Sequence, residues 1–307
     1  MQLTNTVQKI LSNYSDNAGV KTNIARILMH GALGGTGKVV ILPVDQGFEH
    51  GPDRSFAPNP PAYDPLYHFQ IAVDAGLNAY AAPLGMLEMG ADKFAGAIPT
   101  ILKLNSANSL NPSAAPGDQA ITGSIAEALR LGCSAVGFTI YPGSQKAYEM
   151  MEEIAELSRE AKSKGLAVVV WSYPRGPEIS KVAETSVDVI AYAAHMAALL
   201  GASIIKVKPP TAAIFQPEAK EAFDQNNIQL STLSDRIAHV IRASFDGQRI
   251  VVFSGGAGKS EADILNEVRG IRDGGGNGSI IGRNTFQRPR DEALSLLGKI
   301  ISTYKQN

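Results

Sequence analysis

Two lysines at the end of a short apolar run are the residues of this sequence best suited to covalent chemistry. Residues 203–208 read Ser-Ile-Ile-Lys-Val-Lys. Because side chains alternate between the faces of a strand, Lys206 and Lys208 share one face with Ile204, and the other face is apolar. Burial lowers the pKa of a lysine and leaves more free amine, which attacks a ketone to form a Schiff base. Most strand-end lysines are instead surface or phosphate-binding cations, so the pattern alone leaves both interpretations open.

Two glycine-rich segments predict a site for a phosphate group. Ser254-Gly255-Gly256 follows one apolar run, and Gly282-Arg283 ends the next. Glycines let backbone N–H groups approach an anion closely, and an arginine adds a fork of donors that matches phosphate. A Gly-Gly pair is most often an ordinary turn, so each segment is a weak signal. At neighbouring strand ends, together, they favour a phosphorylated substrate.

Two aromatic residues and one aspartate also stand at predicted strand ends. Trp171 and Tyr173 are two positions apart, so they face the same way. The phenol of Tyr173 could exchange a proton with a substrate carbon, although strand aromatics more often only pack. Asp45 ends the first apolar run and is a candidate acid or base, with the capping of a helix or loop as the alternative.

The elements that must carry these residues alternate between short apolar runs and longer helical patterns, which is typical of parallel βα units. Eight such units in about 250 residues match the size of a TIM-type (β/α)8 barrel. An open doubly wound sheet is the alternative. We favour the barrel because no dinucleotide-binding fingerprint follows the first run. The predicted strands cover residues 39–44, 78–82, 100–104, 134–140, 166–171, 203–208, 250–253 and 279–281.

We expect the whole chain, residues 1–307, to form one domain. Residues 1–37 would be an N-terminal helical cap, with helical patterns at 7–14 and 21–28, and residues 38–307 would be the barrel. Further helical patterns cover residues 121–131, 145–164 and 187–200. Two stretches that follow predicted strands, residues 46–65 and 105–117, look like long loops, which in barrels are often functional.

Composition and charge exclude several classes of partner. The chain of 307 residues is 44% hydrophobic and has a formal net charge of -1, so we expect neither nucleic acid nor a membrane as partner. There is no signal-peptide pattern and no apolar run of membrane-spanning length. The single cysteine, Cys133, allows no intramolecular disulfide, which favours the reducing cytoplasm. The five histidines show no close metal-ligand spacing, so we predict no metal and no cofactor.

In this order, the strand-end segments resemble the archaeal-type class I fructose-bisphosphate aldolases, a family also found in bacteria. The resemblance runs from Val39 to the C-terminus and rests on LPVDQGFEHGP at residues 42–52, WSYPRG at 171–176, LGASIIKVK at 200–208 and SGG at 254–256. The Asp-Gln-Gly and Trp-Ser-Tyr-Pro-Arg-Gly segments are specific together, whereas the glycine motifs are not. The sequence departs from the family in two prolines, Pro209 and Pro210, where relatives often carry a polar residue.

The resemblance implies a role for each site residue. Lys206 corresponds to the Schiff-base lysine, Tyr173 to the tyrosine that gives and takes a proton at carbon, and Asp45 to the aspartate that moves protons at substrate oxygens. Trp171 corresponds to the tryptophan that shapes the site. Lys208 and Lys103 stay lesser rivals for the covalent role. The residues that correspond to the phosphate-gripping loops are Ser254, Gly255, Gly256, Gly282 and Arg283.

The implied activity is the reversible cleavage of fructose 1,6-bisphosphate to dihydroxyacetone phosphate and glyceraldehyde 3-phosphate. It implies a phosphorylated sugar as partner, a place in glycolysis and gluconeogenesis, a cytoplasmic location and a homo-oligomer. One alternative is a related Schiff-base lyase, transferase or thiolase, but the Trp171–Tyr173 pair and the loop after Asp45 favour the aldolase. A metal-dependent aldolase is disfavoured by the scattered histidines. A non-catalytic barrel that binds a phosphometabolite or a partner protein is the last alternative.

Overall fold

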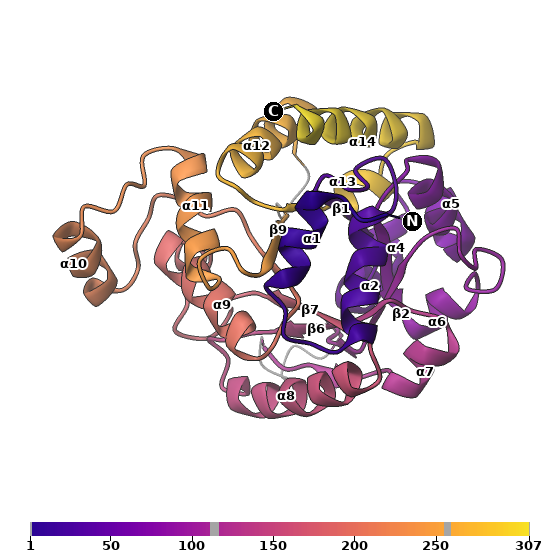
Figure 1. Cartoon of the computed structure of the whole chain (residues 1–307), viewed down its shortest axis with the longest axis horizontal. Helices are drawn as coiled ribbons and strands as arrows, with labels where there is room; N and C mark the ends of the chain where they lie inside the picture. Colours follow the sequence, from indigo (N-terminus) through magenta and orange to yellow (C-terminus); the bar gives the residue numbers. More distant parts are fainter. Residues whose placement is uncertain (1, 111–116, 255–258, 307) are drawn as a thin grey trace.

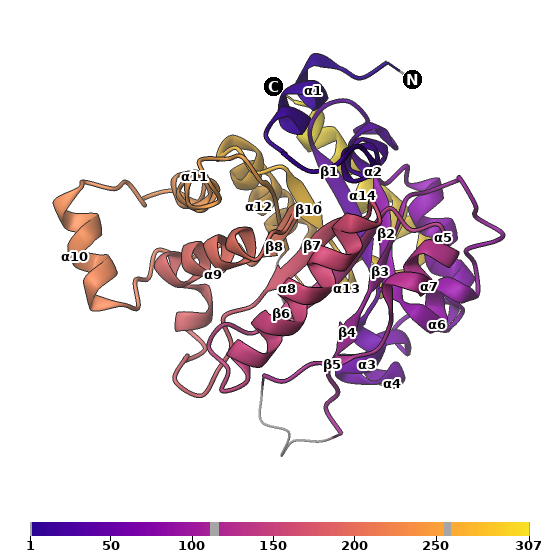
Figure 2. The same cartoon turned by 60° about the horizontal axis from the view of Figure 1, so that its bottom comes forward.

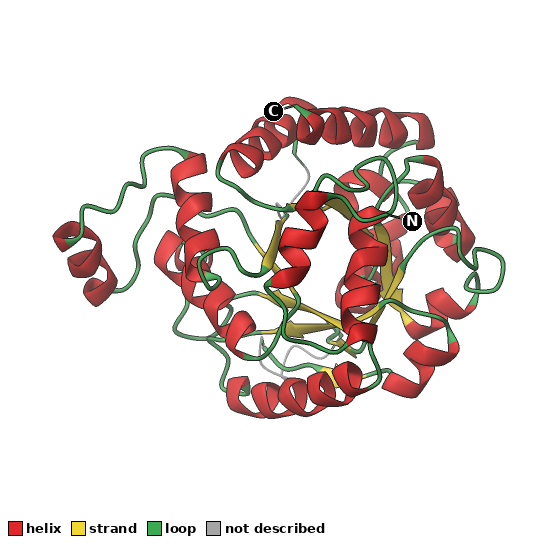
Figure 3. Ribbon diagram, in the orientation of Figure 1, coloured by secondary structure: helices red, strands yellow, loops and turns green. Residues whose placement is uncertain are grey.

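The eight apolar runs are buried along their whole length, and such runs are stable only in a parallel sheet that is covered on both faces. The computed structural model describes residues 2–110, 117–254 and 259–306. In it the runs form eight parallel strands that close into a barrel inside a ring of helices (Figures 1 and 3). The predicted TIM-type barrel is therefore confirmed, and the open-sheet alternative is wrong.

The strands follow the order β1-β10-β9-β8-β7-β6-β3-β2 around the barrel. Each predicted strand is found to within one residue at either end. The register places Trp171 opposite Lys206 and Pro83 opposite Lys103. The strands are β1 Val39–Pro43, β2 Ala79–Pro83, β3 Thr100–Lys103, β6 Ala135–Ile140, β7 Ala167–Ser172, β8 Ile204–Val207, β9 Ile250–Phe253 and β10 Gly278–Ile280.

Alternate strand residues face the barrel interior and the surrounding helices. On β8, Ile204 packs in the interior cluster with Trp171 and Val252, whereas Ile205 and Val207 pack in the cluster under the helices. Lys206 lies in phase with Ile204, so its side chain turns into the barrel, as the alternation predicts.

The helices surround the barrel and cover its ends. The described helices are α1 Asn5–Ser12, α2 Ala18–Met29, α3 Gln46–His50, α4 Pro52–Phe56, η1 Pro60–Tyr63, α5 Pro65–Asp74, α6 Leu84–Glu88, α7 Ile125–Arg130, α8 Ala147–Ser163, η2 Ala183–Thr185, α9 Val187–Leu199, α10 Pro217–Gln225, α11 Leu233–Ala243, α12 Glu261–Asp273, α13 Arg283–Phe286 and α14 Arg290–Lys305. No helix among the described residues is long and apolar enough to cross a membrane. In Figure 2, α10 stands away from the barrel on an extended arm.

The helices α1 and α2 lie across the end of the barrel where the strands begin (Figure 1). Their apolar faces, which include Val7 and Ile24, join the interior cluster of the barrel. The hydroxyl of Tyr14, which follows α1, donates a hydrogen bond to the Ser203 carbonyl over 2.6 Å and accepts one from the Ile250 N–H over 3.2 Å. The N-terminal segment is thus bonded to the first residue of β9 and to the residue before β8.

Two local predictions were wrong. Residues 46–65, predicted as a loop because of their prolines, contain α3, α4 and η1, because Pro52 and Pro60 stand in the first turns of helices, where proline is tolerated. The predicted helix at 121–131 begins only at Ile125, where Ser124 and Glu127 form a capping box. The residues before it, Ala120–Ile121, form β5, which pairs with β4 at Asn105–Ser106.

Gly137 on β6 is expected to be essential for the placement of Trp171. A Cβ atom at Gly137 would lie 2.1 Å from Cζ3 of Trp171, so Gly137→Ala must displace the indole. Overpacking of this kind costs about 1–3 kcal/mol of unfolding free energy. Urea unfolding and the emission of Trp171, the only tryptophan of the chain, measure both effects.

The matched control is Gly298→Ala on α14, where the added Cβ has no contact within 4 Å beyond its chain neighbours and the backbone of its own helix. Removing a glycine from a helix stabilises it by about 0.5–1 kcal/mol, and the emission of Trp171 should not change. An unchanged emission spectrum and unfolding free energy in Gly137→Ala would contradict this account of the barrel interior.

Candidate active site

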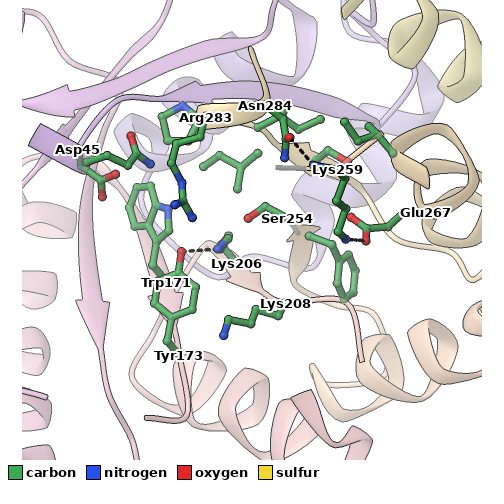
Figure 4. Close-up of a pocket in the computed structure, with 18 of the residues that line it drawn as sticks. Asp45, Trp171, Tyr173, Lys206, Lys208, Ser254, Lys259, Glu267, Arg283 and Asn284 are labelled. Atoms are coloured by element: carbon green, nitrogen blue, oxygen red, sulfur yellow. Dashed lines mark hydrogen bonds and ion pairs between the residues drawn. The ribbon is translucent and has the colours of Figure 1, made fainter. Parts of the chain in front are cut away.

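One pocket opens at the C-terminal ends of the strands, the end at which barrels of this type carry their chemistry. In Figure 4, side chains from β7, β8 and the segments after β1, β9 and β10 surround a common space. Gly255 and Gly256 lie outside the described residues. The predicted site residues that line the pocket are Asp45, Trp171, Tyr173, Lys206, Ser254, Gly282 and Arg283, together with the rival Lys208.

Lys206 is buried at the end of β8, with 3% of its surface exposed. Its Nζ donates a hydrogen bond to the hydroxyl of Tyr173 and lies 3.9 Å from the centre of that ring (Figure 4). Burial, with help from the charges of Lys208 and Arg175 and against that of Asp45, holds the pKa of Lys206 well below its ordinary value of 10.5. A larger fraction of Lys206 is therefore free amine, the form that attacks a carbonyl.

Tyr173, the second residue after Trp171, stays protonated. Burial raises the pKa of its phenol well above 10.0, and the negative charges of Glu49 and Asp45 raise it further. The guanidinium carbon of Arg175 lies 5.1 Å from the centre of the Tyr173 ring. A protonated phenol in contact with an amine is placed to donate a proton beside any imine formed there, which favours the acid–base interpretation over packing alone.

Asp45 follows β1 at the N-terminus of α3, but its side chain makes no capping hydrogen bond. The capping alternative for Asp45 is therefore wrong. Its Oδ2 instead lies 4.0 Å from Nζ of Lys103, which ends β3. Burial raises the pKa of the Asp45 carboxyl, and the charge of Lys103 acts in the opposite direction.

Lys208 lines the same pocket, but its amine is already engaged. Its Nζ forms an ion pair of 2.8 Å with Glu184, which also pairs with Lys181 over 2.8 Å. Burial raises the pKa of Glu184, but the two lysines outweigh it and hold that pKa below its usual value. This ion pair makes Lys208 a weaker candidate than Lys206 for covalent chemistry.

The predicted phosphate segments meet on one side of the pocket. Ser254 follows β9, while Gly282 and Arg283 follow β10. A Cβ atom at Gly282 would lie 2.8 Å from the Pro43 carbonyl, so only glycine lets the turn after β10 pass the end of β1. Ser254 and Arg283 thus face the pocket from adjacent strands, as expected of a phosphate site.

Further polar residues line the pocket without having been assigned a role from the sequence, and five of them stand close to the predicted segments. Lys259 and Asn284 lie on the phosphate side, where the Lys259 N–H donates to Oδ1 of Asn284 over 3.1 Å. Nothing in the local sequence marks either of them. Arg175, Glu49 and His50 line it from the segments after β7 and β1. These three stand inside the WSYPRG and DQGFEHGP motifs, so their neighbours could have identified them.

Among the residues that the structure describes, no group of three or more histidine, cysteine, aspartate or glutamate side chains lies together in a way that could hold a metal ion. The arrangement brings together an amine whose pKa is lowered by burial, a protonated phenol, a carboxyl group and donors for an anion. Such a set can form and hydrolyse an imine and move a proton at a neighbouring carbon.

Comparison with known proteins assigns the barrel to a family of aldolases. Residues 39–288 match the DeoC/LacD family of aldolases. The fructose-bisphosphate aldolase class 1 of Thermoproteus tenax is 38% identical over 257 residues, which are 82% of this chain and 84% of that protein. The probable fructose-bisphosphate aldolase class 1 of Chlamydia muridarum is 33% identical over 97% of this chain and 88% of that protein.

Solved structures give the same result. An archaeal fructose-1,6-bisphosphate aldolase with its catalytic lysine covalently bound to the carbinolamine intermediate of the substrate is 32% identical to this chain. The comparison covers 98% of this chain and 99% of that one, with a TM-score of 0.73. A fructose-bisphosphate aldolase from Slackia heliotrinireducens is 27% identical over 94% of this chain and 88% of that one, with a TM-score of 0.78.

Replacing Lys208 should make Lys206 less reactive near neutral pH. A neighbouring cation disfavours the protonated form of Lys206, so Lys208→Met removes that effect, leaves the charge of Glu184 less compensated and raises the pKa of Lys206. The rate at which a small amine-reactive reagent labels Lys206, followed by peptide mass mapping across pH, should show a midpoint at higher pH than in the wild type.

Lys181→Met is the matched control, because Lys181 pairs with the same Glu184 but is 90% exposed and is absent from the pocket lining. The midpoint for Lys206 should move less in this variant. A midpoint that is unchanged or lower in Lys208→Met would show that Lys208 does not set the pKa of Lys206.

Proposed function

The chain belongs to the DeoC/LacD family of aldolases, and from this premise we propose that it is a class I fructose-bisphosphate aldolase. It cleaves fructose 1,6-bisphosphate reversibly to dihydroxyacetone phosphate and glyceraldehyde 3-phosphate. The observation that carries the proposal is the buried amine of Lys206 in contact with the hydroxyl of Tyr173, beside a segment suited to phosphate.

The reaction begins at Lys206. Its neutral amine adds to the C2 carbonyl of the open-chain ketose, forming a C–N bond and a carbinolamine. Asp45 carries protons to and from the oxygen atoms, so the C2 oxygen leaves as water and a protonated imine remains. The low pKa of Lys206 favours the first step, because an ammonium group has no electron pair with which to attack.

Cleavage then uses the imine as an electron sink. When the C4 hydroxyl loses its proton to Asp45, the C3–C4 bond breaks, its electron pair moves toward the imine, and glyceraldehyde 3-phosphate leaves. The remaining enamine needs a proton on C3, and we assign this proton to Tyr173, whose raised pKa keeps the phenol protonated. Hydrolysis of the resulting imine frees dihydroxyacetone phosphate and the amine of Lys206.

The polar lining of the pocket supports a substrate with two phosphate groups. Ser254, Gly282 and Arg283 offer one set of donors after β9 and β10. Arg175 and His50 offer a second set after β7 and β1. Arginine is well suited to phosphate because its planar fork of donors binds two oxygens at once.

We extend the proposal to the setting of the enzyme. Cleavage and synthesis of this sugar belong to glycolysis and gluconeogenesis, and one cysteine in 307 residues is consistent with a cytoplasmic location. Exposed Tyr148 and Tyr192 border an apolar groove, which supports burial in a homo-oligomer. We also propose that residues 1–307 fold as one domain, because the interior cluster includes α1 and α2.

Borohydride reduction tests the proposed function directly. With dihydroxyacetone phosphate present, reduction of the imine should add the mass of the reduced substrate to the peptide that contains Lys206, and mass mapping identifies the residue. The assay is run with EDTA, which an imine mechanism tolerates.

Lys206→Met should lose the adduct, and Lys208→Met should keep it. An adduct on Lys208 or Lys103 of the wild type would overturn the choice of Lys206. A wild type with no adduct at all would favour the non-catalytic barrel.

Tyr173→Phe should separate proton transfer from imine formation. The variant keeps the ring and Lys206, so the borohydride adduct should still form, whereas protonation of the enamine should slow by a factor of roughly 10²–10⁴. Exchange of the carbon-bound proton of dihydroxyacetone phosphate with solvent measures that step. If exchange in Tyr173→Phe equals that of the wild type, Tyr173 only packs and the proton passes through another group.

A further inference from the structure

Lys103 is a buried lysine to which the proposed mechanism gives no part; burial lowers the pKa of its amine, whereas the charges of Asp45 and Glu49 favour its protonated form. It is the last residue of β3, 2% of its surface is exposed, and it does not line the pocket. A charged amine in such a place needs partners, because its desolvation costs several kcal/mol. Its partners therefore indicate what the residue does.

The amine of Lys103 is anchored on one side by Asn105. Its Nζ donates to the main-chain carbonyl of Asn105 and, over 3.2 Å, to the side-chain Oδ1 of the same residue. Asn105 is itself bonded to both peptide groups of Thr139 on β6: its Oδ1 accepts from the N–H over 2.7 Å and its Nδ2 donates to the carbonyl over 2.8 Å. Two adjacent strands thus fix the position of this cation.

On another side, Lys103 faces the active site. Its Nζ lies 4.0 Å from Oδ2 of Asp45 and 5.9 Å from the ring centre of Trp171. The indole belongs to the interior cluster and is 2% exposed, so it keeps water away from the amine. Asp45 is the acidic group that this cation reaches, since no other ion pair of Lys103 lies within 4.0 Å among the described residues.

We propose that Lys103 is a positioning residue of the aldolase reaction: anchored by Asn105, it holds the Asp45 carboxylate in its ionised form and in place beside Lys206. It is not a second nucleophile, because its amine is committed to two oxygens of Asn105 and to the carboxylate. This role rests on the proposed function, in which Asp45 carries protons at the substrate oxygens.

The sign of the effect follows from the groups around Asp45. Lys103, and Lys206 when it is protonated, favour the ionised form of Asp45, whereas Glu49 on α3 opposes it. His50 and the phenols of Tyr141 and Tyr173 are neutral neighbours. Removing the positive charge of Lys103 makes ionisation harder, so Asp45 takes up its proton at a higher pH. The acid limb of the activity profile, which requires ionised Asp45, should move to higher pH.

The test compares pH profiles of kcat/KM for cleavage of fructose 1,6-bisphosphate in the wild type and in Lys103→Gln. Glutamine can still donate to the Asn105 carbonyl, so it removes the charge and keeps the local hydrogen bonding. On the acid side kcat/KM should fall about tenfold or more, with a smaller loss on the alkaline side. The borohydride adduct should remain on Lys206.

Lys103→Arg should restore the wild-type acid limb, and Lys93→Met, which removes an exposed lysine, should leave the profile unchanged.

A double substitution tests the coupling to Asp45. Asp45→Asn cannot ionise, so adding Lys103→Gln to it should cause no further change in the pH profile. An acid limb that stays in place in Lys103→Gln would overturn the inference, as would a uniform loss at every pH, which indicates a merely structural role, or an adduct on Lys103. If the wild type forms no adduct at Lys206, the proposed function fails instead, so the two failures are distinguishable.

Discussion

The rest of the active site depends on one constraint, the removal of the Lys206 amine from water. An ammonium group at this depth loses the hydration that stabilises its charge, so the neutral form gains. The same burial acts in the opposite sense on the Tyr173 phenol, where the neutral form is the protonated one. A single physical cause thus prepares a base and an acid in contact with each other. Neither state needs a metal ion or a bound group to maintain it.

The barrel separates the residues that stabilise it from those that react. Toward the beginning of the strands the interior is apolar, with Ile204 packed among aliphatic side chains such as Val169 and Ile250. Two residues further along β8, Lys206 points to the same side as Ile204 and lies above this layer, at the open end of the barrel. The indole of Trp171 has room only because β6 carries Gly137 beneath it. The catalytic amine therefore rests on a close-packed layer, which limits the movement of its strand.

The number of apolar runs was enough to predict the barrel, and the alternation of side chains along a strand was enough to predict the inward face of β8. Both depend on local sequence patterns. The pairing of Lys208 with Glu184 was not predictable, because the two residues are 24 positions apart in the sequence and α9 and β8 lie between them. The short helices of residues 46–65 were missed for another reason. Proline breaks a helix in its interior but is well suited to its first turn, and a count of prolines does not distinguish the two. For Arg175, the motif was visible while its stacking on Tyr141 and Tyr173 required the structure.

The two hydrogen bonds of the Tyr14 hydroxyl bear on how the chain folds during its synthesis. Its hydroxyl partners lie 189 and 236 positions later in the chain, so a ribosome has produced most of the protein before either is available. Until then the apolar face of α1 has no barrel to cover. Loop closure over such separations is slow, and exposed apolar surface invites association with other chains. The N-terminal segment, although translated first, can form these hydrogen bonds only after β8 and the start of β9 have been made. Newly made chains therefore leave the apolar face of α1 uncovered for as long as β8 and β9 are missing.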